Sequence, residues 1–133
     1  MKLTVKSEYA LLGLVHLARV GGGGLVPISQ IALAQSIPVK YLEQIFLTLK
    51  RARILQSTKG LGGGYQLARD PATITLAEVV RLFDGALAPT ASVSEFFYQS
   101  TPIEKEEHLV AVFREIRNYV SAKLEGTTLK DIL

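Results

Sequence analysis

A chain of 133 residues that is 48% hydrophobic can bury the core of one domain with an appendage, which excludes global disorder. It has no cysteine, which excludes disulfides and cysteine-ligated metal or cluster sites. It also has no apolar run of the roughly 18 residues that a membrane helix needs. We therefore expect a cytoplasmic protein without cofactor, metal or membrane contact. Residues 1–70 carry nine Lys/Arg and three Asp/Glu, a formal charge of +6, against −3 for residues 71–133, so a polyanionic partner would bind the first half.

The first predicted elements are two helices. One spans residues 7–19, has Ser7 as its N-cap and is apolar on nearly every side, which predicts burial beneath other helices. The glycines at 21–24 end this helix, and they are not a phosphate-binding loop because no Gly-Lys-Ser/Thr follows them. The second predicted helix covers residues 29–35, and the Ser-Ile-Pro sequence at residues 36–38 ends it.

A third predicted helix spans residues 39–53 and is amphipathic. Its apolar residues recur at helical spacing and form one face, made of Leu42, Ile45, Phe46, Leu49 and Ala52. The opposite face is polar and basic except for Leu47, which either stays exposed or is buried by a rotation of the helix. A longer basic helix that follows a short helix and a tight break is typical of a helix-turn-helix. The alternative interpretation is a solvated basic face with no partner.

A β-hairpin is predicted directly after the third helix. Strands at residues 54–58 and 65–68 flank the glycine-rich turn KGLGGG at residues 59–64, and a hairpin in this place is the wing of a winged helix-turn-helix. Glycines there allow positive φ and a close approach of the backbone to another molecule. A dinucleotide-binding loop is not expected, because the GxGxxG pattern is not met and a strand follows where that motif requires a helix.

The second half of the chain is predicted to hold two more helices around an irregular segment. Thr75 and Glu78 form a capping box for a helix that ends at Gly85, and residues 86–102 are irregular. A long helix follows at residues 103–124.

Three glutamates, Glu104, Glu106 and Glu107, are placed in the first turn of the long helix, where the helix dipole favours them. Thr128 with Asp131 caps a final short turn. The apolar stripe of the long helix, which requires a partner helix, consists of Leu109, Phe113, Ile116, Val120 and Leu124.

Four segments resemble the IscR/NsrR/CymR-type bacterial transcription regulators: LTVKSEYALLGLVHLA, YLEQIFLTLKRARIL, KGLGGGYQLARDPATITLAEVVRLFDG and LEGTTLKDIL. The resemblance extends over residues 2–133 and is weakest at 92–107. A Tyr-Leu-Glu-Gln helix paired with a Gly-Gly-Gly-Tyr wing at this spacing is a specific signature. It implies a mainly α fold with a small β-hairpin wing: a winged helix-turn-helix DNA-binding domain at 1–86, a loop at 87–102, and a dimerisation helix with a short C-terminal helix at 103–133.

The resemblance also implies which residues contact double-stranded DNA. The major-groove residues would be Lys40, Tyr41, Glu43 and Gln44, with Tyr41 alternatively packed on the first helix or bound to a phosphate. The residues that touch the DNA backbone would be Lys50, Arg51 and Arg53. The wing residues would be Lys59, Gly60, Gly62, Gly63 and Gly64. Tyr65 has two interpretations, a functional one and packing beneath the wing, and packing is the one expected.

The loop before the long helix departs from the cluster-binding members, which carry three cysteines there. This chain has none, so it resembles a cluster-free branch of the family. Its consecutive aromatic residues Phe96, Phe97 and Tyr98 have two interpretations: packing beside the dimer helix, or a docking surface for a small-molecule or protein effector.

The expected function is that of a sequence-specific transcriptional regulator, a repressor in the simplest case, that acts as a homodimer on a pseudo-palindromic operator without an iron–sulfur cluster. The alternative is a protein-interaction module, or a regulator controlled by a partner such as a cysteine-biosynthetic enzyme. An enzyme is not expected, because His16 and His108 have neither a neighbouring nucleophile nor metal-ligand spacing.

Overall fold

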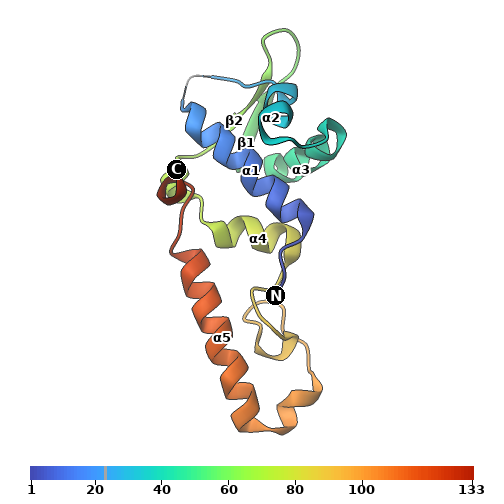
Figure 1. Ribbon diagram of the computed structural model, residues 1–133, viewed down its shortest axis with the longest axis vertical. Coiled ribbons are helices and arrows are strands. Elements are labelled where there is room, and N and C mark those ends of the chain that lie inside the picture. Colours follow the sequence, from blue (N-terminus) through green and yellow to red (C-terminus); the bar gives the residue numbers. More distant parts are fainter. Residues whose placement is uncertain (23) are drawn as a thin grey trace.

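The computed structural model describes residues 1–22 and 24–133, so Gly23 of the predicted glycine connection lies outside the described residues. The fold is mainly helical with one hairpin, which confirms the predicted fold class (Figure 1). The helices are α1 (Val5–Val20), α2 (Ile28–Gln35), α3 (Val39–Arg51), α4 (Leu76–Asp84) and α5 (Glu107–Glu125), and the antiparallel strands are β1 (Leu55–Thr58) and β2 (Gly64–Leu67). Short 3-10 turns lie at Pro71–Thr73, Ala91–Val93, Pro102–Lys105 and Lys130–Ile132.

The main core forms where α1 contacts α2, α3, α4 and β2. The predicted apolar face of α3 is buried there, and Leu42, Phe46 and Leu49 have no exposed surface. Gly13 in the middle of α1 is required by this packing, because a Cβ at that position would lie 2.6 Å from Cε1 of Phe46. Figure 1 shows the hairpin projecting from one end of the molecule, while α5 and the loop before it extend at the other. No helix within residues 1–22 or 24–133 combines the length and the apolar character that a membrane span requires.

The predicted N-cap of α1 is wrong by three residues. Thr4 is the cap: its side-chain oxygen accepts a hydrogen bond from the Ser7 amide at 3.4 Å, and Ser7 itself is buried. A tertiary contact accounts for the earlier start of the helix: Thr4 also donates from its amide and its hydroxyl to the carboxylate of Asp84 at the end of α4. Burial alone would raise the pKa of Asp84, but hydrogen bonding, above all from Thr4, outweighs it and the pKa is lowered.

The capping box predicted for α4 forms only in part. Thr75 is the N-cap and accepts from the Glu78 amide at 3.1 Å, and Gly85 is the C-cap, as expected. The Glu78 carboxylate does not return to the cap, because Arg69, which follows β2, binds it at 2.6 Å. A charged guanidinium is a stronger partner for a carboxylate than a backbone amide.

Helix α3 ends two residues earlier than predicted. Ala52 is its C-cap, and Arg53 adopts a left-handed conformation with φ of 61°. The Arg53 and Ile54 amides donate to the carbonyls of Lys50 and Leu49, which is the hydrogen-bond pattern of a left-handed helix end. This end turns the chain at once into β1, whose register pairs Leu55 with Leu67 and Thr58 with Gly64.

Helix α5 begins later than predicted, at Glu107, so only one of the three glutamates lies in its first turn. Glu104 belongs to the preceding 3-10 turn, where Tyr98 and Ser100 donate to its carboxylate at 2.6 and 2.7 Å. Residues 86–101 are irregular except for the turn at Ala91–Val93, which agrees with the prediction up to its last residue, Pro102, where the next 3-10 turn begins.

The end of the chain returns to the core of the helix-turn-helix unit. Leu129 is fully buried there, and its amide donates to the Ile74 carbonyl at 3.0 Å. Thr128 and Asp131 exchange hydrogen bonds, which confirms the predicted final cap. The backbone and hydroxyl of Thr128 lower the pKa of the Asp131 carboxyl. The segment after α5 is therefore fixed on the N-terminal part of the chain.

Candidate nucleic-acid interface

Helix α3 turns its polar face to solvent. Lys40, Glu43 and Gln44 are exposed near its beginning, opposite the buried apolar face. Leu47 is 43% exposed, so the helix is not rotated to bury it. The outward surface of α3 therefore offers a cation, a carboxylate and a carboxamide, which are the groups that read base edges in a DNA groove.

The break before α3 is built by a buried residue and a left-handed one. Ser36 takes φ of 56° at the end of α2, and the Ile37 amide donates to the Ala32 carbonyl at 2.9 Å. Ile37 is 5% exposed and anchors the turn in the core, while Pro38 precedes the first turn of α3. These contacts fix α2 against α3 and hold the outward face of α3 in one orientation.

Two tyrosines near this surface make packing contacts that involve α3. Tyr41 is half-buried and meets Tyr9 of α1 edge-to-face, with ring centroids 5.6 Å apart. Tyr65 of β2 meets Phe46 in the same way at 5.0 Å. Burial raises the pKa of Tyr65, and the negative charge of Glu43 raises it further. The packing interpretation holds for Tyr65, and of the alternatives weighed for Tyr41 the contact with the first helix is present.

The cations of this surface have no acidic partner. The ion pairs within residues 1–22 and 24–133 are Arg69–Glu78, Arg81–Glu125 and Arg117–Glu95. None of them includes the cations of α3 and the segment up to the hairpin turn, all of them exposed: Lys40, Lys50, Arg51, Arg53 and Lys59. Uncompensated cations on one part of a protein surface create the positive potential that attracts a polyanion.

The hairpin is hydrogen-bonded to the segment before α2 at its base, and its tip is narrow. The Val26 and Tyr65 backbones exchange hydrogen bonds of 2.8 Å, so the segment before α2 pairs with β2. A Cβ on Gly64 would lie 2.4 Å from the Val26 carbonyl oxygen, and a Cβ on Gly63 would lie 2.2 Å from that of Thr58. These two glycines allow the close approach, and the turn itself carries few side chains.

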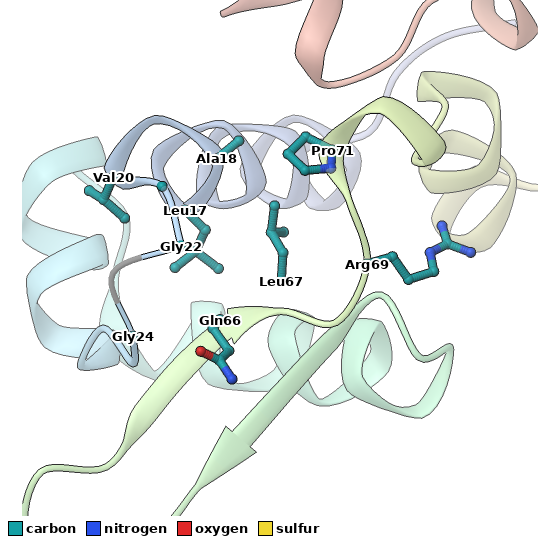
Figure 2. A pocket seen from close by; sticks show the side chains of 10 residues that line it. Leu17, Ala18, Val20, Gly22, Gly24, Gln66, Leu67, Arg69 and Pro71 are labelled. Atoms are coloured by element: carbon teal, nitrogen blue, oxygen red, sulfur yellow. The ribbon is translucent and has the colours of Figure 1, made fainter.

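A small cavity of about 160 Å³ lies between the C-terminal end of α1 and β2 (Figure 2). Figure 2 shows Leu17, Ala18 and Leu67 at the cavity, whereas the Arg69 side chain extends away from Leu67. The Arg69 guanidinium pairs with the Glu78 carboxylate. The lining is mostly apolar and brings together no pair of catalytic groups. Neither histidine lines this cavity: His16 is half-buried in α1, and His108 is exposed on α5.

The aromatic residues of the loop before α5 are not buried by the rest of the chain. Phe96, Phe97 and Tyr98 are 64%, 48% and 59% exposed. The Arg81 guanidinium lies over the Phe96 ring, 4.9 Å from its centroid. The hydrogen bond to Glu104 raises the pKa of Tyr98 and lowers that of Glu104. Packing inside the chain's own core therefore does not account for these rings.

Helix α5 carries two apolar faces where the sequence stripe suggested one. Phe113, Val120 and Leu124 pack inward. Val120 and Leu124 pack against the small buried cluster formed by Ala77, Val80 and Leu87. Phe113 packs against a second small cluster, formed by Ala88, Val93 and Val110. Leu109 and Ile116 point outward, each 43% exposed, together with two residues that the stripe missed, Val112 and Tyr119. The outward set is spaced 3, 4 and 3 residues apart, which is the heptad pattern of a helix pair, and this spacing was readable in the sequence.

Comparisons with known proteins agree with this geometry. A family model described as Rrf2, iron-dependent transcriptional regulator, matches residues 3–133. The transcriptional regulator CymR of Bacillus subtilis is 30% identical over 132 residues, which cover 99% of this chain and 89% of CymR. The solved structure of CymR, the global cysteine regulator of B. subtilis, superposes with a TM-score of 0.80 at 30% identity, covering 99% of this chain and 95% of that one. IscR of T. potens gives a TM-score of 0.76 at 26% identity, with 99% and 85% covered.

The iron dependence in the family description does not fit the ligands of this chain. The sequence contains no cysteine and therefore no thiolate for an iron–sulfur cluster. Among the residues that the structure describes, no group of three or more His, Cys, Asp or Glu side chains is placed to hold a metal ion. The loop before α5 presents exposed aromatic rings instead, and the hydroxyl of Thr101 donates to that of the buried Ser92.

Proposed function

Since the chain belongs to the Rrf2 family of transcriptional regulators, we propose that it is a homodimeric repressor that binds a pseudo-palindromic DNA site through α3 and the hairpin, without an iron–sulfur cluster. The observation that carries this proposal is the exposed face of α3, where polar groups that match base edges stand beside cations with no acidic partner.

Base reading is assigned to the first turns of α3. The major groove is about 12 Å wide and admits a helix, whose N-terminal residues meet the base edges. Gln44 can bind adenine through two hydrogen bonds, and Glu43 can accept one from cytosine N4. Lys40 reaches guanine or a phosphate, and the exposed Leu47 can contact a thymine methyl group.

Backbone contacts are assigned to the cations around this helix. Lys50 and Arg51 lie at its C-terminal end, and the left-handed conformation of Arg53 starts the chain toward the hairpin. Lys59 stands at the hairpin turn and would reach the adjacent minor groove or its phosphates. Such contacts position a protein on the duplex without reading its sequence.

Dimerisation is assigned to the outward face of α5, made of Leu109, Val112, Ile116 and Tyr119. These four residues are 43%, 52%, 43% and 73% exposed, and water would contact an apolar stripe along most of the helix in a monomer. A second copy of α5 covers this stripe by two-fold pairing, since its heptad spacing suits another helix of the same kind. The dimer presents two α3 helices to successive turns of one face of the duplex, roughly 34 Å apart or a multiple of that distance.

Control by an effector at the aromatic loop is the second candidate function. The exposed rings of Phe96 and Phe97 favour it, because they lie beside α4 and at the start of the segment that leads into α5. A partner protein bound there would act on the dimer helix. CymR is described as the global cysteine regulator of its organism, so a cysteine-biosynthetic enzyme is the first partner to test.

The proposed function is tested by selecting bound duplexes from a random DNA pool with the purified protein. We expect an enriched site with two-fold symmetry. If the dimer neutralises about 6 to 10 phosphates, its affinity for that site should fall by roughly 10³ to 10⁵ between 50 and 200 mM salt. A pool that shows no enrichment at low salt, or a protein that is monomeric at the concentrations used, would contradict the proposal.

Replacing Gln44 by alanine should relax the preference at one base pair of each half-site. The change removes a bidentate partner of adenine, and discrimination at that position should fall by about ten-fold or more. Gln44 is exposed, so the fold should be retained. Repeating the selection with the variant measures the effect, and an unchanged sequence preference would exclude Gln44 from base reading.

A further inference from the structure

The hairpin turn holds one large side chain at its outermost corner, Leu61. The Gly63 amide donates to the Gly60 carbonyl at 3.0 Å, and Gly62 has φ of 77°. This combination defines a type II turn over residues 60–63, with Leu61 at its second position. Leu61 has a relative exposure of 109%, higher than any other large apolar side chain among the described residues.

Turn chemistry does not account for a leucine at this corner. The second position of a type II turn accepts most residues and favours proline, so a small or polar residue would close the turn equally well. Residues 60–64 are otherwise all glycine, and no atom lies within 4 Å of where a Cβ on Gly60 or Gly62 would stand. Leu61 thus stands alone on a narrow tip with open space on both sides.

The tip is also held in place. Thr58 pairs with Gly64 at the end of the hairpin, and the approach of the Thr58 carbonyl to Gly63 leaves no room for a side chain there. The base of β2 is joined to Val26 and carries Tyr65 against the core. An apolar group on a narrow and anchored projection, next to the exposed cation Lys59, can enter a groove that a bulkier loop cannot.

We infer that Leu61 is an apolar wedge that enters the minor groove of the bound DNA and bends it; this inference rests on the proposed function. The minor groove is about 6 Å wide, and apolar side chains inserted between base steps kink the duplex by 20–90°. Lys59 supplies the charge that brings the tip to the phosphates, and Leu61 unstacks a base step. Pyrimidine–purine steps such as TA and CA/TG unstack most readily, so the wedge selects sequence at positions where it makes no base-edge hydrogen bond.

The test uses the duplex that wild-type protein selects from a random pool, placed at different positions within fragments of equal length to measure bending by gel mobility. Wild-type protein should bend it by some tens of degrees, and selected sites should be enriched in TA or CA/TG steps where the tip lies. Leu61→Ala should lose at least about half of the bend and that enrichment, with an affinity loss of about ten-fold or less. Leu61→Met should keep the bend, because it retains an apolar wedge of similar size.

Two further variants separate the wedge from general effects. Lys59→Ala should weaken binding and lower the salt dependence while the bend persists in the bound complex. Leu33→Ala, which removes an 84% exposed leucine from α2, should leave the bend unchanged. The inference is overturned if Leu61→Ala bends and selects DNA as wild type does, or if Leu33→Ala reduces the bend equally. A wild-type protein that selects no DNA would instead refute the proposed function itself.

Discussion

Replacing Ile116 by glutamate should convert the protein to a monomer of 14.5 kDa and lower its affinity for the operator by about 10³. Ile116 lies within the outward stripe of α5, between Val112 and Tyr119. In a two-fold dimer the substitution occurs on both helices, so two carboxylates would be brought into an apolar contact, where an unpaired charge is costly. The affinity falls because each half-site would then be bound separately, without the gain that linking two binding units provides.

Asn118→Glu is the matched control for this experiment. It places the same side chain on the exposed part of the same helix, away from the outward stripe and from the residues that pack inward. Analytical ultracentrifugation measures the mass, circular dichroism the helix content, and a gel shift the affinity. If Ile116→Glu stays dimeric with full affinity, α5 does not form the dimer contact, and the aromatic loop becomes the next surface to test.

Replacing Gly64 by alanine should lower the free energy of unfolding by about 3 kcal/mol, which corresponds to a fall in Tm of roughly 10 °C for a chain of this size. Two costs combine at this position. Its φ is 155°, a conformation that residues with a side chain rarely adopt, and the added Cβ would lie 2.4 Å from the Val26 carbonyl oxygen. The pair of hydrogen bonds between Val26 and Tyr65 must open, and Tyr65 would shift from Phe46 in the core.

Gly60→Ala separates the two costs. Gly60 has φ of 92°, but a Cβ there meets no atom within 4 Å. We therefore expect a loss of only about 1 kcal/mol, from backbone strain alone. Thermal unfolding followed by circular dichroism measures both variants. Equal Tm values for the two would show that the clash with the Val26 carbonyl adds no cost beyond the backbone strain.

Patterns among neighbouring residues were enough to predict the buried face of α3, the ends of α4 and the hairpin. The spacing of the apolar residues in α3 identified its buried face, since a helix of 3.6 residues per turn places Leu42, Ile45, Phe46 and Leu49 on one side whatever surrounds it. Thr75 and Gly85 marked the ends of α4, and the Thr128–Asp131 cap was correct, because these signals act within one turn. The glycine cluster indicated a hairpin since its turn requires positive φ.

Partners distant in sequence changed the details. Arg69 took the carboxylate of Glu78 out of the predicted capping box, and Asp84, 80 residues from Thr4, moved the start of α1. In both cases a local hydrogen bond competes with one that only the folded chain brings within reach. A local exception lies at the end of α3, where Arg53 takes the left-handed conformation that the rule reserves for glycine, and the Arg53 and Ile54 amides donate to the Lys50 and Leu49 carbonyls.

The sequence by itself determined the type and order of the elements and the basic character of the first half, because hydrophobic period, capping residues and formal charge are properties of neighbouring residues. Only the tertiary structure decided which cations lack acidic partners, which face of α5 is left for another molecule, and that Leu61 stands alone at the hairpin tip. Those properties depend on what else packs around a side chain. A helix with apolar residues on two sides cannot reveal, from its spacing alone, which side its own core will cover.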